Sequence, residues 1–320
     1  MYRTNLQLEA KQAFVINHQS QIMTIGSCFS QNIGSLMEEY KFYCSVNPFG
    51  VLYNPISIER ILSYCLKEKT LPDDLYIQNN EVWSHYWLHS QHSSLCLEEL
   101  KKHHHRLLVN TAKTLQKTNT LLITLGTAYV HELKEHKQIV ANCHKMPSNA
   151  FDKRLLSIGD IVASLQQIRD ILPENVRIIY SLSPIRHTKE GLENNCLSKS
   201  LLRAALAEHI KNNNNSCYFP AYELLIDDLR DYRYYEKDLI HPNEQAIAYI
   251  WDTFQDCFLD KVSQQLIKKI HPLLKACHHK AFFPETSQHQ AFLKSTIDKM
   301  KGIKEVDFSK EIEKLQKEIK

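Results

Sequence analysis

The chain has 320 residues, 43% hydrophobic and 23% charged, an ordinary globular composition with enough apolar side chain for a sizeable core. Its formal net charge is +3 and its basic residues are scattered, so we expect no nucleic-acid partner. The N-terminal segment lacks an apolar secretion signal, and no stretch approaches the roughly 18 apolar residues of a spanning helix. We therefore expect a cytoplasmic protein with no membrane partner.

Short aliphatic runs bounded by Gly, Ser or Pro predict four buried parallel strands, at Gln21–Ile25, Thr120–Leu125, Val176–Leu182 and Cys217–Phe219. Apolar residues at helical spacing predict helices around them, at Gln31–Tyr40, Ile56–Lys67, Leu97–Gln116, Ser157–Leu172, Leu197–Lys211 and Asn243–Leu259. This alternation indicates an α/β fold, a doubly wound parallel sheet with helices on both faces. Residues 78–94 are predicted to form an ordered surface loop or a short hairpin.

The character of the chain changes near Asp260, where lysine-rich helices begin. We therefore predict one domain over residues 1–260 and a helical C-terminal extension over residues 261–320. We expect the extension to pack on the main domain or to form a homo-oligomer contact, and we do not expect it to carry catalytic residues. The run His103-His104-His105 lies on a predicted helix, where consecutive side chains point in different directions, and is expected to form a solvated face.

Nine cysteines are spread through the chain, and none of them forms a CxxC pair. The sequence therefore lacks the motif that is typical of zinc-ribbon and thioredoxin-like sites, and we expect reduced, mostly buried thiols. Cys143 and His144 are adjacent, but neighbouring residues do not readily face one ion and no further ligand spacing supports them. We expect neither a metal nor a cofactor.

A turn from strand to helix at Gly26-Ser27-Cys28 is the first candidate for chemistry. Such turns at the carboxyl edge of a parallel sheet hold ligands, and the N-terminus of the following helix stabilises an anionic nucleophile or oxyanion. Ser27 and Cys28 are both possible nucleophiles. The alternative is structural: Ser27 caps the helix, Cys28 packs inside, and neither reacts.

Asp238 and His241 are the candidate acid–base pair, three residues apart and just before the last helix of the main domain. At this spacing the carboxylate can orient the imidazole, which then takes a proton from the nucleophile and returns it to the leaving group. The structural alternative is that Asp238 caps the turn and that His241 is an ordinary surface histidine.

Together these residues resemble the SGNH (GDSL-type) hydrolase superfamily, which pairs a nucleophile turn near the N-terminus with a DxxH motif before the last helix. The chain resembles the GSCFA-domain family more closely, with Ser30 in place of that motif's final Ala. The matching segments follow one another over roughly residues 20–255: Gly26–Ser30, Asn47–Pro55, Thr124–Ala128, Asn142–Lys145, Ser181–Pro184, Ser198–Arg203, Tyr218–Glu223 and Asp238–His241.

The resemblance implies a three-layer α/β/α fold of the SGNH-hydrolase or flavodoxin-like type. It implies an esterase or acyl-transfer hydrolase that acts on a small acyl or acetyl ester, a carbohydrate ester among them, through a covalent acyl intermediate. It further implies oxyanion donors at the positions of Gly50 and Ala128, with Gly126 and Thr127 beside the substrate. Loop residues His144, Lys145 and Arg186 are candidate substrate contacts.

Two departures from the superfamily pattern leave the identity of the nucleophile and of the oxyanion donors undecided. In register, Cys28 takes the place of the nucleophilic serine, and Ser27 takes the place of an aspartate. Ala128 stands where an asparagine would donate to the oxyanion, so we expect Asn142 to supply the missing amide. A cysteine-dependent thioesterase or transferase and a catalytically inactive ligand-binding module are therefore alternatives to the ester hydrolase.

Overall fold

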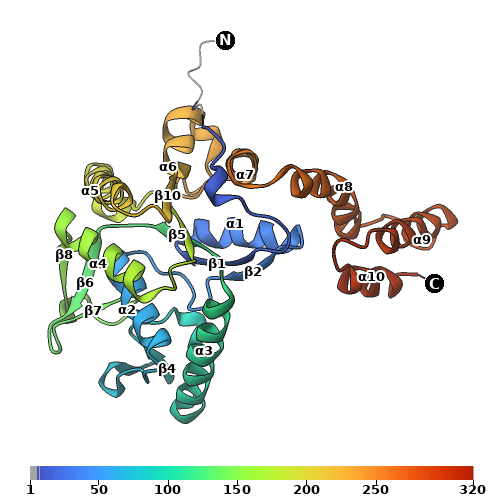
Figure 1. Cartoon of the computed structure of the whole chain (residues 1–320). Coiled ribbons are helices and arrows are strands. Elements are labelled where there is room, and N and C mark those ends of the chain that lie inside the picture. The colour runs from blue at the N-terminus through green and yellow to red at the C-terminus, as the bar shows by residue number, and fades with distance from the viewer. Residues whose placement is uncertain (1–5, 7, 320) are drawn as a thin grey trace.

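The computed structural model describes residues 6 and 8–319 and is built around a five-stranded parallel sheet (Figure 1). Across the sheet the strands are β2 (Tyr43–Val46), β1 (Gln21–Gly26), β5 (Thr120–Leu125), β9 (Arg177–Leu182) and β10 (Ser216–Phe219). Counted in chain order these strands read 2-1-3-4-5, which is the flavodoxin-like order of doubly wound sheets. The predicted fold class is confirmed.

Helices cover both faces of this sheet. On one face lie α2 (Pro55–Leu66), α3 (Leu97–Lys117), α4 (Ile158–Ile171) and α5 (Leu192–Lys211), and on the other lie α1 (Cys28–Glu39) and α7 (Glu244–Phe258). Alternate residues of one strand serve the two faces: Met23 and Ile25 join the first core cluster, whereas Ile22 joins the second. The sheet is therefore buried on both sides, which explains its nearly continuous aliphatic strands.

Two small antiparallel sheets are attached to this core. The hairpin of β3 (Tyr76–Asn79) and β4 (Val82–His85) overlaps the region predicted as a loop or hairpin and begins two residues before it. A second sheet has the order β7 (Gln138–Val140), β6 (Tyr129–Leu133) and β8 (Phe151–Leu155). The sequence did not indicate this sheet or β2, because these short strands are only partly buried and lack a long aliphatic run.

Short helical turns link the main elements. They are the 3-10 turns Gln12–Phe14, Asp73–Leu75, Ser90–His92, Ser148–Ala150, Thr188–Glu190 and Tyr232–Tyr234, the short helix α6 (Ala221–Glu223) and a π-helical turn at Leu224–Leu229. No helix in the described part of the chain combines the length and the apolar character needed to cross a bilayer.

The C-terminal extension consists of α8 (Lys261–His278), α9 (Ser287–Gly302) and α10 (Ser309–Gln316), which lie to one side of the sheet in Figure 1. Its apolar residues belong to the same core cluster as α1 and α7. Tyr40 Oη lies 2.7 Å from His271 Nδ1, and Lys41 pairs with Glu311 at 2.5 Å. The extension thus packs on its own chain, and a role in oligomer formation stays a prediction.

Candidate active site

A cavity of about 450 Å3 opens at the carboxyl ends of β1, β5 and β9. The strand order changes direction between β1 and β5, and open α/β sheets bind ligands beside this switch point. Segments far apart in the sequence supply the lining, which is mixed polar and aromatic: Cys28, Tyr53, Asn54, Thr127, Tyr129, His131, Val140–Cys143, Lys153, Ile185–Glu190, Ile240 and His241.

The turn after β1 separates the two predicted nucleophiles. Ser27 is fully buried, and its Oγ accepts a hydrogen bond from the Phe29 N–H at 3.3 Å, as the N-cap of α1. Cys28 is the first residue of α1; it is half-buried and lines the cavity. The two side chains therefore point to different surroundings, and the thiol faces the space that a substrate could occupy.

Gly26 makes this turn possible. Its φ of +144° is unfavourable for L side chains, and a Cβ atom there would lie 2.2 Å from the Thr124 carbonyl oxygen. The same carbonyl accepts the Ser27 N–H at 3.0 Å. Glycine thus lets the end of β1 press against β5 and brings the start of α1 to the sheet edge.

Tyr53 is a polar partner of the Cys28 thiol. Its Oη lies 3.8 Å from Cys28 Sγ. Burial, and secondarily the neighbouring sulfur, raise the pKa of the Tyr53 phenol well above its usual value. The phenol therefore stays protonated at neutral pH and can donate its hydrogen to a thiolate.

Asp238 and His241 form the predicted pair. Asp238 Oδ2 lies 2.6 Å from His241 Nδ1, while Oδ1 accepts the backbone N–H groups of Ile240 at 2.9 Å and His241 at 3.0 Å. These hydrogen bonds lower the pKa of Asp238 to about 2, the backbone bond from His241 contributing most. The carboxylate thus caps the turn and also orients the imidazole, leaving His241 Nε2 for the cavity that it lines with Cys28.

Of the two predicted oxyanion donors, Asn142 lines the cavity and Gly50 does not. The Gly50 N–H donates to the Asn47 carbonyl at 2.7 Å, and Gly50 does not line the cavity. Asn142 does line it, with its Nδ2 3.4 Å from Ser90 Oγ. Asn54 is a further amide in the lining that sequence analysis missed. Its position directly before Pro55 is the pattern of a helix N-cap, and its Oδ1 does cap α2 by accepting the Ser57 N–H at 2.8 Å. No local pattern indicated that Asn54 also lines the cavity.

Some of the predicted substrate contacts line the cavity and others do not. Thr127 and Arg186 line the cavity, whereas Gly126, His144 and Lys145 do not. The Gly126 N–H donates to the Tyr53 carbonyl at 2.7 Å, so that residue supports the wall of the cavity. His144 is buried, with its Nε2 2.9 Å from the His85 carbonyl, and this burial lowers its pKa.

Lys199 is buried beneath the cavity and does not line it. Lys199 Nζ donates to the carbonyls of Gly126 and Ser183, each at 2.7 Å, and burial lowers its pKa to about 7. It ties together the loops that follow β5 and β9. The adjacent Ser198 Oγ accepts the Ala128 N–H at 2.7 Å. Helix α5 thus holds the loop in which Ala128 replaces the expected asparagine.

His187 is the second histidine of the cavity wall. Its Nε2 is buried with no hydrogen-bond partner in the described part of the chain, and its ring lies edge-on to Tyr53, 5.3 Å between centroids. Burial, and secondarily Lys199 and His241, lower its pKa to about 4. His187 is therefore neutral at pH 7 and adds no charge beside the thiol.

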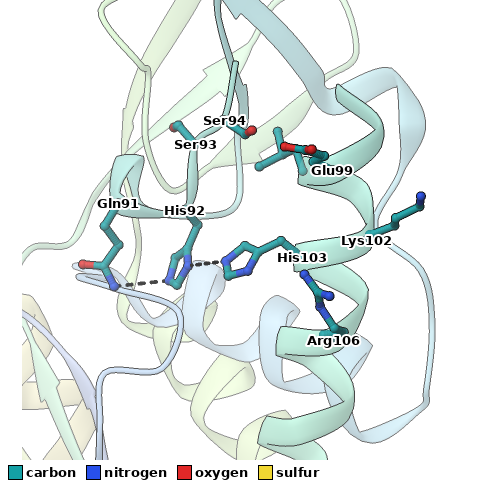
Figure 2. Close-up of a pocket in the computed structure, with 9 residues that line it drawn as sticks. Gln91, His92, Ser93, Ser94, Glu99, Lys102, His103 and Arg106 are labelled. Atoms are coloured by element: carbon teal, nitrogen blue, oxygen red, sulfur yellow. Dashed lines mark hydrogen bonds between the residues drawn. The ribbon is translucent and has the colours of Figure 1, made fainter. Parts of the chain in front are cut away.

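A second hollow, of about 560 Å3, lies between residues 91–94 and α3 (Figure 2). Figure 2 shows the rings of His92 and His103 pointing toward each other, and His92 Nδ1 lies 3.1 Å from His103 Nε2. The next residue, His104, is buried, with Nε2 2.9 Å from the His92 carbonyl. The predicted solvated face is therefore wrong for His104. The lining holds no Asp–His pair, so this hollow is not the candidate active site.

Neither cavity contains a cluster of metal ligands among the described residues. Among the residues that the structure describes, no group of three or more His, Cys, Asp or Glu side chains is arranged to hold a metal ion.

Comparison with protein families fits the motifs around this cavity. The GSCFA family model matches residues 21–254, which span all five strands of the main sheet and both halves of the site. The chain belongs to the GSCFA family. A model described as the C-terminal domain of GSCFA domain proteins matches residues 270–320, within the helical extension. No curated protein matches the chain.

Proposed function

We propose that this GSCFA protein is a thiol-dependent esterase or acyl-transfer hydrolase that acts on small acyl or acetyl esters, including those of carbohydrates. One observation carries the proposal: Cys28 and His241 line the same cavity, whereas Ser27 Oγ is enclosed in the cap of α1. The strand order and the place of the DxxH turn also support a proposed kinship with SGNH hydrolases.

The proposed reaction begins when His241 takes the proton of the Cys28 thiol, which leaves a thiolate and an imidazolium. The N-terminus of α1 and the Tyr53 hydroxyl stabilise this anion. Its sulfur attacks the ester carbonyl carbon, and the carbonyl oxygen becomes an oxyanion. When this intermediate collapses, the carbon–oxygen bond to the alcohol breaks and the alcohol takes a proton from His241. The acyl group remains on sulfur as a thioester.

Deacylation reverses the proton movements. His241 removes a proton from water, and the hydroxide attacks the thioester carbonyl carbon. The carbon–sulfur bond then breaks, the acid product leaves, and the sulfur takes the proton back from His241. Asp238, bonded to Nδ1, stabilises the imidazolium in both halves of the reaction. The backbone N–H of Cys28 and the side-chain amides of Asn54 and Asn142 are the proposed oxyanion donors.

Turnover of 4-nitrophenyl acetate tests this proposal. Cys28→Ala and His241→Ala should abolish turnover, because they remove the nucleophile and the base. Cys143→Ala is the matched control, since this thiol lines the same cavity but does not begin a helix. Activity that disappears with Cys143→Ala and survives Cys28→Ala would refute the assignment.

A second candidate function is ligand binding without catalysis. Two observations favour it. The Gly50 N–H already donates a hydrogen bond to the Asn47 carbonyl, and Ala128 has no side-chain amide that could donate to an oxyanion. This hypothesis predicts that a panel of short-chain esters, thioesters and acetylated sugars gives no turnover with any form of the protein. Measurable turnover that depends on Cys28 would exclude it.

A further inference from the structure

Arg186 connects the loop after β9 to the turn that carries the acid–base pair. Its backbone N–H donates to the Ile240 carbonyl at 3.3 Å, and its guanidinium Nη2 donates to the carbonyl of Leu239. These carbonyls belong to the two residues between Asp238 and His241. A single residue therefore holds the middle of the DxxH turn from the cavity side.

Aromatic rings fix the guanidinium in this position. Its central carbon lies 4.3 Å from the ring centroid of Tyr235 and 5.2 Å from that of Tyr232. Arg186 Nε is buried and has no hydrogen-bond partner among the described residues. The planar group thus faces the turn and the tyrosines, an arrangement that suits arginine and not lysine.

The turn needs such support for two reasons. Leu239 has a φ of +58°, a left-handed conformation that is costly for a residue with a branched side chain. The side chains of Asp238 and His241 are each nearly half exposed, so burial does little to hold them. The loop is otherwise closed at its base, where Tyr235 pairs with Pro242 and the Glu236 N–H donates to the His241 carbonyl at 2.8 Å.

We propose that Arg186 is a positioning residue, which holds the Asp238–His241 turn so that His241 Nε2 faces Cys28; the inference rests on the proposed function. It replaces the expectation that Arg186 contacts the substrate. A substrate contact would act on binding, whereas a positioning residue acts on the geometry of the base. The two roles therefore predict different kinetic changes.

Kinetics of Arg186→Met and Arg186→Lys make the first test. Because Arg186→Met loses a hydrogen bond from a charged donor, its kcat for 4-nitrophenyl acetate should fall roughly 10- to 100-fold with little change in KM. Arg186→Lys keeps the charge but not the planar group, so its kcat should fall less. The matched control is Arg233→Met, which removes an exposed guanidinium that pairs with Asp231 at 2.8 Å on the same loop. In Arg186→Ala, ethylguanidinium should restore part of the lost kcat.

The opposite kinetic pattern overturns the proposal. If Arg186→Met keeps kcat and raises KM, above all for an ester with an anionic acyl group, Arg186 binds substrate and does not position the base. Thermal unfolding checks that each variant is folded. Arg186→Lys, which keeps the charge and much of the volume, provides the milder variant if Arg186→Met does not fold.

Proton NMR separates this inference from the proposed function. The proton on His241 Nδ1, hydrogen-bonded to Asp238, should give a downfield resonance that disappears in His241→Ala. Arg186→Met should shift or broaden this resonance, and Arg233→Met should leave it unchanged. A wild-type protein that shows the resonance without turning over any ester refutes the proposed function but not the positioning role. An unchanged resonance in Arg186→Met refutes the positioning role.

Discussion

Ser27→Ala is the substitution that best distinguishes a structural serine from a reactive one. The Ser27 hydroxyl is buried and accepts the Phe29 N–H at 3.3 Å at the first turn of α1. Alanine keeps the backbone of the turn but cannot accept this hydrogen bond. The change therefore removes a helix cap and leaves a buried N–H without its partner, while Cys28 and its contact with Tyr53 stay in place.

The size of the effect follows from these two losses. Removing a Ser N-cap typically costs about 1 kcal/mol, and a buried donor left without a partner raises the cost to about 2 kcal/mol. For a chain of this length, such a loss lowers the melting temperature by roughly 1.5–3 °C. Catalysis per folded molecule should be nearly unchanged, because the hydroxyl does not face the cavity.

Two measurements on the same preparation check this prediction. Urea denaturation gives the free energy of unfolding, and ester turnover is normalised to the folded fraction that the same denaturation curve gives. Cys28→Ala is the reference variant, and we expect it to lose turnover with little loss of stability. The reasoning is refuted if folded Ser27→Ala loses activity as completely as Cys28→Ala does.

Three further predictions concern the buried polar groups. Tyr53→Phe should slow alkylation of Cys28 by iodoacetamide about tenfold at pH 7, since the thiolate loses a hydrogen-bond donor; an unchanged rate would contradict that contact. His104 has a pKa lowered to about 4 by burial, so the unfolded chain takes up its proton first as the pH falls. Its contribution to the free energy of unfolding, about 3 kcal/mol, is present above pH 6.5 and is lost between pH 6.5 and about 4. Urea unfolding of His104→Gln should therefore show a smaller decrease in the free energy of unfolding over this pH range. Lys199 has a pKa of about 7 in the folded chain, so stability should rise between pH 7 and 10.5 while only the unfolded lysine stays charged. Lys199→Met should lack this rise, and an identical pH dependence in both proteins would contradict the burial argument.

The main sheet could be predicted because its strands are buried on both faces. Continuous aliphatic runs such as Thr120–Leu125 can be recognised without knowledge of the partner strands. The strand β2 escaped prediction because its four residues lie at the sheet edge and none is fully buried. Local sequence thus identified the centre of the fold, and tertiary contacts were needed for its periphery.

The candidate site was predicted in part for similar reasons. The contact between Asp238 and His241 is local, so their three-residue spacing was enough to indicate it. The directions of Ser27 and Cys28 depend on the exact residue at which α1 begins, and the sequence left both open. The buried position of Lys199 depends on carbonyls at the ends of two distant strands, which no local pattern reveals.

Identification of the acylated residue tests the central claim most directly. The protein is mixed with 4-nitrophenyl acetate, quenched in acid and digested, and the peptide that contains residues 27 and 28 is fragmented in a mass spectrometer. The proposed reaction predicts an acetyl group on Cys28 that hydroxylamine removes and that does not form in Cys28→Ala. An acetyl group on Ser27, or turnover of the ester with neither residue modified, would contradict it.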